Sequence, residues 1–399
     1  MRYKDLSDIS SIIMGQSPAK DSVNRDKIGY PLLNGPTEFS TYSPKPVQYT
    51  TDAKRIAPKG SLLFCVRGST TGRMNWADQE YAIGRGLAAI VCDEDYQKFY
   101  VREIIELKLP ELLSKATGST FPNVSKQDLH QLKVPFVHNM YFTSNFVANV
   151  SNKIELNNQM IATLEELAAT LFKQWFVDFE FPDENGNPYK SSGGKMVDSE
   201  LGEIPEGWEV KSLTQIAVYK NGLAMQKFRP TDMDNSLPVL KIKELNQGFV
   251  DSSSDRCSID IKDDVKVFNG DVIFSWSGTL LVKLWTGGNA GLNQHLFKVT
   301  SDQYGKWFYF LWTKHYLNQF IEIAKDKATT MGHIKRENLN NSKVCYPTTD
   351  ELWKMFSGTF SGLIDKLIEL GLENNSLKKT RDSLLPKLLL GELNLKKDD

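Results

Sequence analysis

The chain has 399 residues, of which 40% are hydrophobic and 24% are charged, and its net charge is −1. This composition is typical of a globular protein and excludes a disordered chain, while the near-neutral charge counts against a protein that holds nucleic acid by total charge alone. Four cysteines lie in apolar runs without a C-x-x-C pair, the N-terminus lacks a signal-peptide pattern, and no apolar run reaches the ~18 residues of a membrane span. We therefore expect a cytoplasmic protein with buried free thiols.

The first element in chain order is a globular module over residues 1–143. Strand-like runs at Ser61–Val66 and Gly86–Cys92 and a helical pattern at Lys98–Leu107 predict an α/β or α+β fold. The stretch from Lys20 to Arg85 holds ten Lys and Arg residues against six Asp and Glu residues. This excess of positive charge favours contact with an anionic partner, although solvated loops would give the same pattern.

A long helix is predicted over residues 144–180. Its apolar residues alternate at spacings of three and four, which is typical of a coiled-coil seam. A single asparagine in such a seam costs stability and specifies the register of the helix pair. The predicted seam consists of Val147, Val150, Ile154, Asn157, Ile161, Leu164, Ala168, Leu171 and Trp175.

A connector over residues 181–207 leads to a second module over residues 208–348 that repeats the first. At an offset of 210 residues, Gly60–Phe64 lies over Gly270–Phe274, and similar matches follow downstream. A repeat of this length indicates two copies of one domain and not a solenoid.

The second module has the same kinds of elements as the first. Strand-like runs occur at Val239–Ile242, Val272–Trp276 and Leu296–Val299, and a helical pattern covers Trp307–Ala324. Its basic stretch, Lys211–Lys243, holds six Lys and Arg residues against two Asp residues.

A second long helix is predicted over residues 349–391, before a tail at 392–399. We expect Pro386 to kink or end it. Either orientation of the two long helices is possible, but related modules that dock about a pseudo-two-fold axis would make them antiparallel, and we expect Asn157 to face Asn374. Amphipathic helices of two separate domains are the alternative. The predicted seam consists of Trp353, Phe356, Phe360, Leu363, Leu367, Leu370, Asn374, Leu377, Arg381, Leu384 and Leu388.

The common signatures of nucleotide, metal and methyltransferase sites are missing from the sequence. The run Ser192–Met196 lacks the first glycine and the hydroxyl residue of a phosphate-binding loop, and Asn187–Tyr189 has one proline too few for an amino-methyltransferase motif. None of the five histidines pairs with another histidine or cysteine at metal-ligand spacing. We therefore expect no catalytic residue, no metal and no cofactor in this chain.

The sequence resembles the specificity subunits of Type I restriction–modification systems along nearly its whole length. No single run is diagnostic, but the order and spacing of the runs, together with the duplication, are specific. The runs that carry the resemblance are Ile13–Pro18, Ser69–Ile90, Thr117–Asn123, Leu171–Asp178, Leu201–Trp208, Leu384–Leu389 and Gly391–Leu393.

The resemblance implies two similar target-recognition domains separated by two long antiparallel spacer helices, with pseudo-two-fold symmetry. Each domain would read one half of a split double-stranded DNA target in the major groove. The subunit would be non-catalytic and would bind two methyltransferase subunits that methylate adenine at N6, as well as ATP-dependent endonuclease subunits in a full complex. S-adenosylmethionine, Mg²⁺ and ATP would belong to those partners. The sequence departs from the family pattern at Ala328–Thr330, where the first module has Gly118–Thr120.

Candidate DNA contacts lie in polar loops that follow predicted strands. Arginine pairs with guanine and asparagine or glutamine with adenine, whereas threonine and lysine often contact phosphates. Ordinary turn residues would give the same pattern at any one position. The candidates of the first module are Gln16, Arg67, Ser69, Thr70, Arg73, Arg85, Thr120 and Lys126, and those of the second are Ser275, Trp276, Ser277, Thr279, Asn293, Gln294, Thr330, His333 and Lys335.

Two other functions remain open on the sequence. One is a self-sufficient DNA methyltransferase or nuclease, which cofactor binding by the purified chain would support. The other is a coiled-coil scaffold without DNA readout, which would capture proteins without conferring sequence choice on them.

Overall fold

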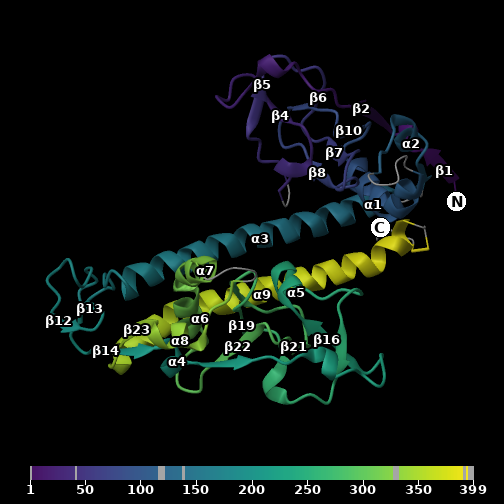
Figure 1. The fold of residues 1–399 in the computed structure, drawn as a ribbon. Coiled ribbons are helices and arrows are strands. Elements are labelled where there is room, and N and C mark those ends of the chain that lie inside the picture. Colours follow the sequence, from purple (N-terminus) through teal and green to yellow (C-terminus); the bar gives the residue numbers. More distant parts are fainter. Residues whose placement is uncertain are drawn as a thin grey trace, which may run out of the picture. The chain divides into compact units, whose positions relative to one another are not determined.

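The computed structural model describes residues 2–40, 43–115, 122–136, 140–326, 332–389 and 392–393. These residues form two compact units, one made of Met1–Glu155 with Leu377–Asp399 and the other of Leu156–Ser376. Each unit contains one module of mixed helices and sheets together with parts of both long helices (Figure 1). The predicted fold class is therefore confirmed.

The first unit is built on a four-stranded antiparallel sheet in the order β2 (Ser10–Met14), β10 (Leu87–Cys92), β7 (Leu62–Cys65) and β8 (Met74–Trp76). All four residues of β7 are buried, because Leu62 and Phe64 pack in one core while Leu63 and Cys65 pack in another. Successive side chains of a strand point to opposite faces of the sheet, and both faces are covered here. This explains why the strand is apolar at every position.

The remaining elements of the first unit surround this sheet. Helix α1 (Gln97–Lys115) covers one face, and its Tyr100 and Ile104 share the core of Phe64. The second sheet has the order β3 (Val23–Asn24), β5 (Gln48–Thr50), β4 (Tyr30–Leu33), β9 (Tyr81–Ile83) and β6 (Ile56–Ala57), and the other elements are β1 (Arg2–Asp5), β11 (Lys133–Phe136), α2 (Lys126–His130) and the 3-10 turns η1 (Leu6–Asp8), η2 (Lys20–Ser22) and η3 (Pro36–Glu38).

The second unit repeats this plan. Its main sheet has the order β15 (Val218–Asn221), β22 (Leu296–Thr300), β19 (Val272–Ser275) and β20 (Leu281–Leu284), which matches the first sheet strand for strand. Its second sheet has the order β17 (Arg256–Ser258), β16 (Ser236–Leu240), β21 (Ala290–Leu292) and β18 (Lys266–Val267). In both units one strand pair of the second sheet, β4–β9 or β16–β21, is parallel. The duplication predicted from the sequence is therefore present in the topology.

The helices of the second unit differ more. The single helix predicted at Trp307–Ala324 is two helices, α6 (Lys306–His315) and α7 (Leu317–Asp326).

The predicted connector contains an antiparallel hairpin of β12 (Met196–Ser199) and β13 (Gly202–Pro205). The other elements are β14 (Trp208–Ser212), β23 (Lys343–Pro347), α4 (Leu213–Ile216), α5 (Ile242–Gln247), α8 (Arg336–Asn341), η4 (Met225–Lys227) and η5 (Asp263–Val265).

The long helices are α3 (Met140–Phe176) and α9 (Asp350–Leu389). Within the second unit they run antiparallel, because the Trp175 ring lies 5.4 Å from that of Phe356 while Asn157, farther back along α3, meets Asn374, farther along α9. Asn157 Nδ2 donates to Asn374 Oδ1 at 3.0 Å, as predicted from the two seams. A polar pair therefore lies in the buried face of both helices.

In the first unit the end of α9 completes the core. Leu385 and Leu389 pack in the same cluster as Val147 at the start of α3. The sequence predicted that Pro386 kinks or ends the second helix. It does not end it, since α9 continues to Leu389. Proline removes one helical hydrogen bond, and the buried leucines on both sides of Pro386 hold this last turn in place.

The buried face of the long helices is wider than the predicted seam near their ends. Phe172, Phe176, Ile364, Leu385 and Leu389 are buried although the seam pattern omits them. These helix ends pack against sheet modules as well as against each other, so that the apolar stripe widens. Of the predicted seam residues, Val147, Val150, Ile154, Asn157, Ala168, Phe356, Phe360, Leu367, Leu370, Asn374 and Leu388 are buried, while Ile161, Leu164, Leu171, Trp175, Trp353, Leu363, Leu377, Arg381 and Leu384 are partly exposed.

Two smaller expectations can be compared with the structure. Cys65, Cys257 and Cys345 are buried free thiols, but Cys92 at the end of β10 is only half-buried. No helix among the described residues is long and apolar enough to span a bilayer.

Candidate nucleic-acid interface

A hollow of about 960 Å³ with a mixed polar and apolar lining opens on the second module. It lies between the end of β16, helix α5, the segment before β17 and the turn that follows β21. Four cations line it, and although two of them, Lys241 and Lys243, lie beside aspartates, Arg229 and Arg256 leave an excess of positive charge that favours an anionic ligand. The polar lining residues are Gln226, Arg229, Lys241, Lys243, Ser252, Ser254, Asp255, Arg256, Asn293, Gln294 and His295.

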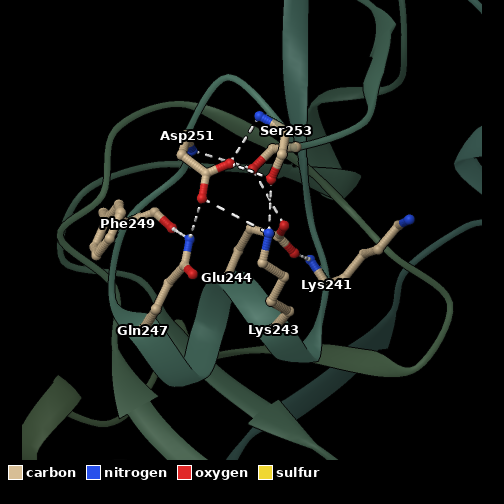
Figure 2. Close-up of polar contacts among 8 residues, drawn as sticks. Lys241, Lys243, Glu244, Gln247, Phe249, Asp251 and Ser253 are labelled. Carbon is tan, nitrogen blue, oxygen red and sulfur yellow. Dashed lines mark hydrogen bonds and ion pairs between the residues drawn. The ribbon is translucent and has the colours of Figure 1, made fainter. Parts of the chain in front are cut away.

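A buried carboxylate holds one wall of the hollow together. Glu244 on α5 is 2% exposed, and its two oxygens accept from the backbone N–H of Lys241 at 3.2 Å and from Ser254 Oγ at 3.1 Å. A buried carboxylate needs such donors because burial removes its water. Glu244 therefore caps the first turn of α5 and fixes the returning segment on it (Figure 2).

The two lysines of this wall are held by aspartates of the returning segment. Lys241 pairs with Asp255, while Lys243 donates to Ser253 Oγ at 2.8 Å and lies 3.7 Å from Asp251 Oδ2. Hydrogen bonds from the hydroxyl and backbone of Ser253 lower the pKa of Asp251 to about 2. Asp251 thus stays an anion and orients Lys243 at the rim (Figure 2).

The floor of the hollow is the turn after β21. Asn293 Nδ2 donates to Gln294 Oε1 at 3.0 Å, and the N–H of His295 donates to Asn293 Oδ1 at 3.3 Å. The His295 ring is held in turn by Ser277 Oγ, 2.9 Å from Nδ1. Gln294 is therefore held in place by a chain of part-buried hydrogen bonds.

The structure corrects several candidates of the second module. Ser275 is 0% exposed because β19 extends through it, and its hydroxyl donates to the carbonyl of Ser277. Ser277 and Asn293 are also buried. These three side chains are almost fully covered and mainly position their neighbours, although Asn293 still borders the hollow.

The remaining candidates of the second module divide by their contacts. The Trp276 ring lies 5.8 Å from that of Phe297, and its Nε1 donates to Asn221 Oδ1 at 3.1 Å, so most of its surface packs on the module. Thr279, His333 and Lys335 are exposed. Thr330, like Thr120 of the first module, lies outside the described residues.

The candidates of the first module lie on its surface. Gln16, Arg67, Ser69, Arg73, Arg85 and Lys126 are exposed, and Thr70 is half-buried. Arg67 Nε donates to Asn123 Oδ1 at 3.0 Å, which holds the loop after β7 against the segment before α2. A backbone β-bridge joins the same two positions in both modules, Arg67 with Asn123 in the first and Ser277 with His333 in the second.

Matched backbone hydrogen bonds identify equivalent positions in the two modules. The residue before Arg85 donates its N–H to the carbonyl of Leu33 at the end of β4, at 2.8 Å. The residue before Gln294 donates in the same way to Leu240 at the end of β16, at 3.1 Å. Because β4 and β16 hold the same place in their sheets, Arg85 and Gln294 are equivalent.

None of the four cations around the hollow is among the candidates predicted from the sequence. Arg229, Lys241 and Lys243 lie in the basic stretch Lys211–Lys243, but charge counting could not select them, and Arg256 lies beyond it. Helix α5 has six residues, too few for a periodic pattern to be visible. Among the described residues no group of three or more His, Cys, Asp or Glu side chains could hold a metal ion.

Comparison with known proteins identifies the class of this duplicated fold. Residues 1–166 and 205–370 each match the family of the Type I restriction modification DNA specificity domain. The chain therefore belongs to the family of Type I restriction–modification specificity subunits, with one family domain in each repeat, and the resemblance noted in the sequence is confirmed.

Individual relatives agree with this assignment. The chain is 28% identical to the Type I restriction enzyme MjaIX specificity subunit of Methanocaldococcus jannaschii over 352 residues, which are 85% of this chain and 79% of that protein. It is 20% identical to the HindI specificity subunit of Haemophilus influenzae over 406 residues, 86% of this chain and 88% of the relative. The crystal structure of the Type I system S subunit from M. genitalium shares the fold, with a TM-score of 0.55 and 14% identity over 97% of this chain and 95% of that one.

Proposed function

We propose that this chain is the non-catalytic subunit that selects the DNA sequence for a Type I modification complex. Each module reads one half of a bipartite target in the major groove. The observation that supports this most strongly is that the two modules share one scaffold but differ in the side chains of the same turn: the sheet orders agree, while the equivalent positions carry Arg85 and Gln294. Two copies of one DNA-recognition domain need different base-contacting side chains only where the two half-sites differ in sequence.

The long helices are proposed to set the spacing between the half-sites. Helix α3 has 37 residues, and at about 1.5 Å per residue it is roughly 55 Å long. One turn of B-DNA is about 34–36 Å, so a helix of this length exceeds one turn of the duplex and is long enough to act as the spacer between two half-sites. The hydrogen bond between the buried Asn157 and Asn374 fixes the register of the two helices, and with it the spacing that we propose they set.

The helices also offer a surface for the methyltransferase subunits. Leu156, Met160 and Leu167 are 52%, 37% and 43% exposed. They are spaced by four and seven residues, which places them along one stripe of α3. We propose that this stripe docks a methyltransferase subunit, and that S-adenosylmethionine, Mg²⁺ and ATP are bound by partner subunits and not by this chain.

Methylome sequencing of cells with and without the gene tests the function. We expect loss of a single split N6-methyladenine motif when the gene is deleted. An unchanged methylome contradicts the proposal. A second assay measures S-adenosylmethionine binding to the purified chain, where binding without any partner would favour a self-sufficient enzyme instead.

A further inference from the structure

The equivalent residues Arg85 and Gln294 are presented by the same turn in the two modules. We propose that they are the matched base-reading side chains of the protein: Arg85 reads a guanine in one half-site, and Gln294 reads an adenine in the other. The inference rests on the proposed function and adds to it the chemical identity of one base pair in each half of the target.

The backbone of this turn is fixed in both modules by close approaches that only glycine permits. A Cβ atom at Gly15, at the end of β2, would overlap the carbonyl oxygen of Gly84. A Cβ atom at Gly222, at the end of β15, would overlap the carbonyl oxygen of Asn293 in the same way. The residues that follow, Arg85 and Gln294, therefore start from equivalent and tightly constrained positions. Such constraint is what a side chain needs to meet one base edge reproducibly.

In the first module, the turn leaves Arg85 as its one projecting side chain. A Cβ atom at Gly84 would collide with the side chain of Asn34, and one at Gly86 would lie 2.5 Å from the Asn34 carbonyl oxygen. Both flanking glycines therefore lie flat against Asn34. The Arg85 side chain is exposed, and its guanidinium has no hydrogen bond or ion pair within the part of the chain that the structure describes. Its bidentate donor pair matches the O6 and N7 acceptors of guanine.

In the second module, the neighbours of Gln294 hold it at the floor of the basic hollow. Asn293 donates to Gln294 Oε1, and Gln294 Nε2 lies 3.4 Å from His295 Nε2. These contacts orient the amide and leave one lone pair and one N–H available. A glutamine amide pairs with the N6 donor and N7 acceptor of adenine. The cations Arg229 and Lys243 at the rim suit the flanking phosphates.

A contrast with a nearby position separates base reading from phosphate contact. Ser125 and Lys335 hold matching places before α2 and α8, since their N–H groups donate to the side chains of Asp128 and Asn338 at 2.7 and 2.8 Å. The next residue is Lys126 in one module and Arg336 in the other, so positive charge is kept. Phosphates are present in every sequence, and a phosphate contact can therefore stay the same in both copies. The change from arginine to glutamine at the Arg85 position is instead the change expected of a base contact.

The test exchanges the two side chains in the full-length chain, expressed with its methyltransferase partner, and reads the motif by methylome sequencing. Arg85→Gln should change one base pair of the first half-site from G·C toward A·T and leave the second half-site unchanged. Gln294→Arg should do the reverse. Arg85→Ala should lose the preference for guanine by roughly 5- to 150-fold at that same base pair, the range of one bidentate contact. Gln303→Arg, the same substitution at an exposed loop of the second module, should leave the motif unchanged.

Two outcomes overturn the inference. If Arg85→Ala lowers methylation at all sites alike and leaves the motif unchanged, Arg85 is a phosphate contact. If both exchanges leave both half-sites unchanged while the variants melt and assemble like the wild type, these residues do not read bases. In either case the wild-type gene still directs one bipartite motif, so the proposed function stands. Loss of that function is recognised separately, by a methylome that is insensitive to deletion of the gene.

Discussion

The two modules share the way their backbones are hydrogen-bonded and differ in the side chains that this backbone carries. The main sheets have the same strand order, and a glycine closes the same turn at Gly15 and Gly222. The cores, by contrast, share the plan and not the residues. The second core is crowded with aromatic rings from α6, α3 and α9, whereas the first is largely aliphatic around Phe64 and Tyr100. Backbone hydrogen bonding and close approach thus constrain a duplicated domain more tightly than the identity of its core side chains, as expected where volume and pattern suffice for packing.

The largest expected effect concerns the aromatic core of the second unit. Phe176 is 1% exposed, and its ring lies 4.9 Å from Phe356 and 5.4 Å from Trp208. Phe176→Ala should lower the free energy of unfolding by about 3–5 kcal/mol, because it removes a buried ring and leaves a cavity. Chemical denaturation measures the loss, and hydrogen exchange should place it in the second unit. Gln174→Ala, on the exposed side of α3, is the control, and equal losses in the two variants would contradict the assignment.

A second substitution asks whether the first unit depends on the distant end of the chain. Leu389 is 1% exposed and packs in the core that contains Val147. Leu389→Ala should cost about 2–5 kcal/mol, with faster hydrogen exchange in β7 and β10 and little change in β19 and β22. Lys387→Ala, an exposed neighbour, should have almost no effect. If exchange increases only in the second unit, α9 does not contribute to the first core.

The glycine at the base of each recognition turn gives a smaller and symmetrical prediction. Gly15→Ala and Gly222→Ala each push a methyl group into a carbonyl oxygen. Such overpacking should lower the free energy of unfolding by about 1–3 kcal/mol. Each variant should also weaken recognition of its own half-site and leave the other intact, as measured by binding of the assembled complex to DNA with one half-site altered. Gly358→Ala, at an exposed helical position with open space around it, should be neutral or slightly stabilising. Equal effects of Gly15→Ala on both half-sites would show that the turn is not local to one module.

The sequence predicted the features that depend on periodicity and repetition. The two copies, the long helices and the Asn157–Asn374 contact all follow from spacing, because a seam pattern constrains which faces must meet. It did not predict the wider buried face at Phe172 and Leu385, since that face depends on sheets brought there by the fold. The candidate site was predicted less well for the same reason. Ser275 was a candidate contact because of its hydroxyl group, but it lies inside the predicted strand Val272–Trp276, and as the last residue of β19 its side chain is buried in the core.

The basic hollow shows a second limit of sequence reasoning. Lys241 and Asp255 meet because α5 and the segment after it fold back on each other through Glu244. When charged residues are counted along the sequence, Lys241 and Asp255 cancel. A charge pattern therefore cannot distinguish a lysine that is paired with an aspartate from one that is available to a phosphate. The basic stretch was visible in the sequence, but its individual roles depend on tertiary contacts.

The smallest net effect is expected at the polar pair of the long helices. Asn157→Leu alone should cost about 1–3 kcal/mol, because it leaves the buried amide of Asn374 with fewer partners. The double variant Asn157→Leu/Asn374→Leu should recover most of that loss or exceed wild-type stability, since two apolar residues replace a desolvated polar pair. A double-mutant cycle in urea measures the coupling, and independent, additive losses would contradict a direct contact.

The value of this pair should then lie in specificity and not in stability. Leucines in the seam pack in more than one register, whereas the Asn157–Asn374 hydrogen bond exists in one. The double variant should therefore methylate targets with a wider range of spacer lengths, even though it melts at the same or a higher temperature. The half-site sequences should stay as they are in the wild type, because neither recognition turn is touched. A spacer that stays fixed in the stable double variant would mean that apolar packing alone, including Phe172 and Phe360, sets the register.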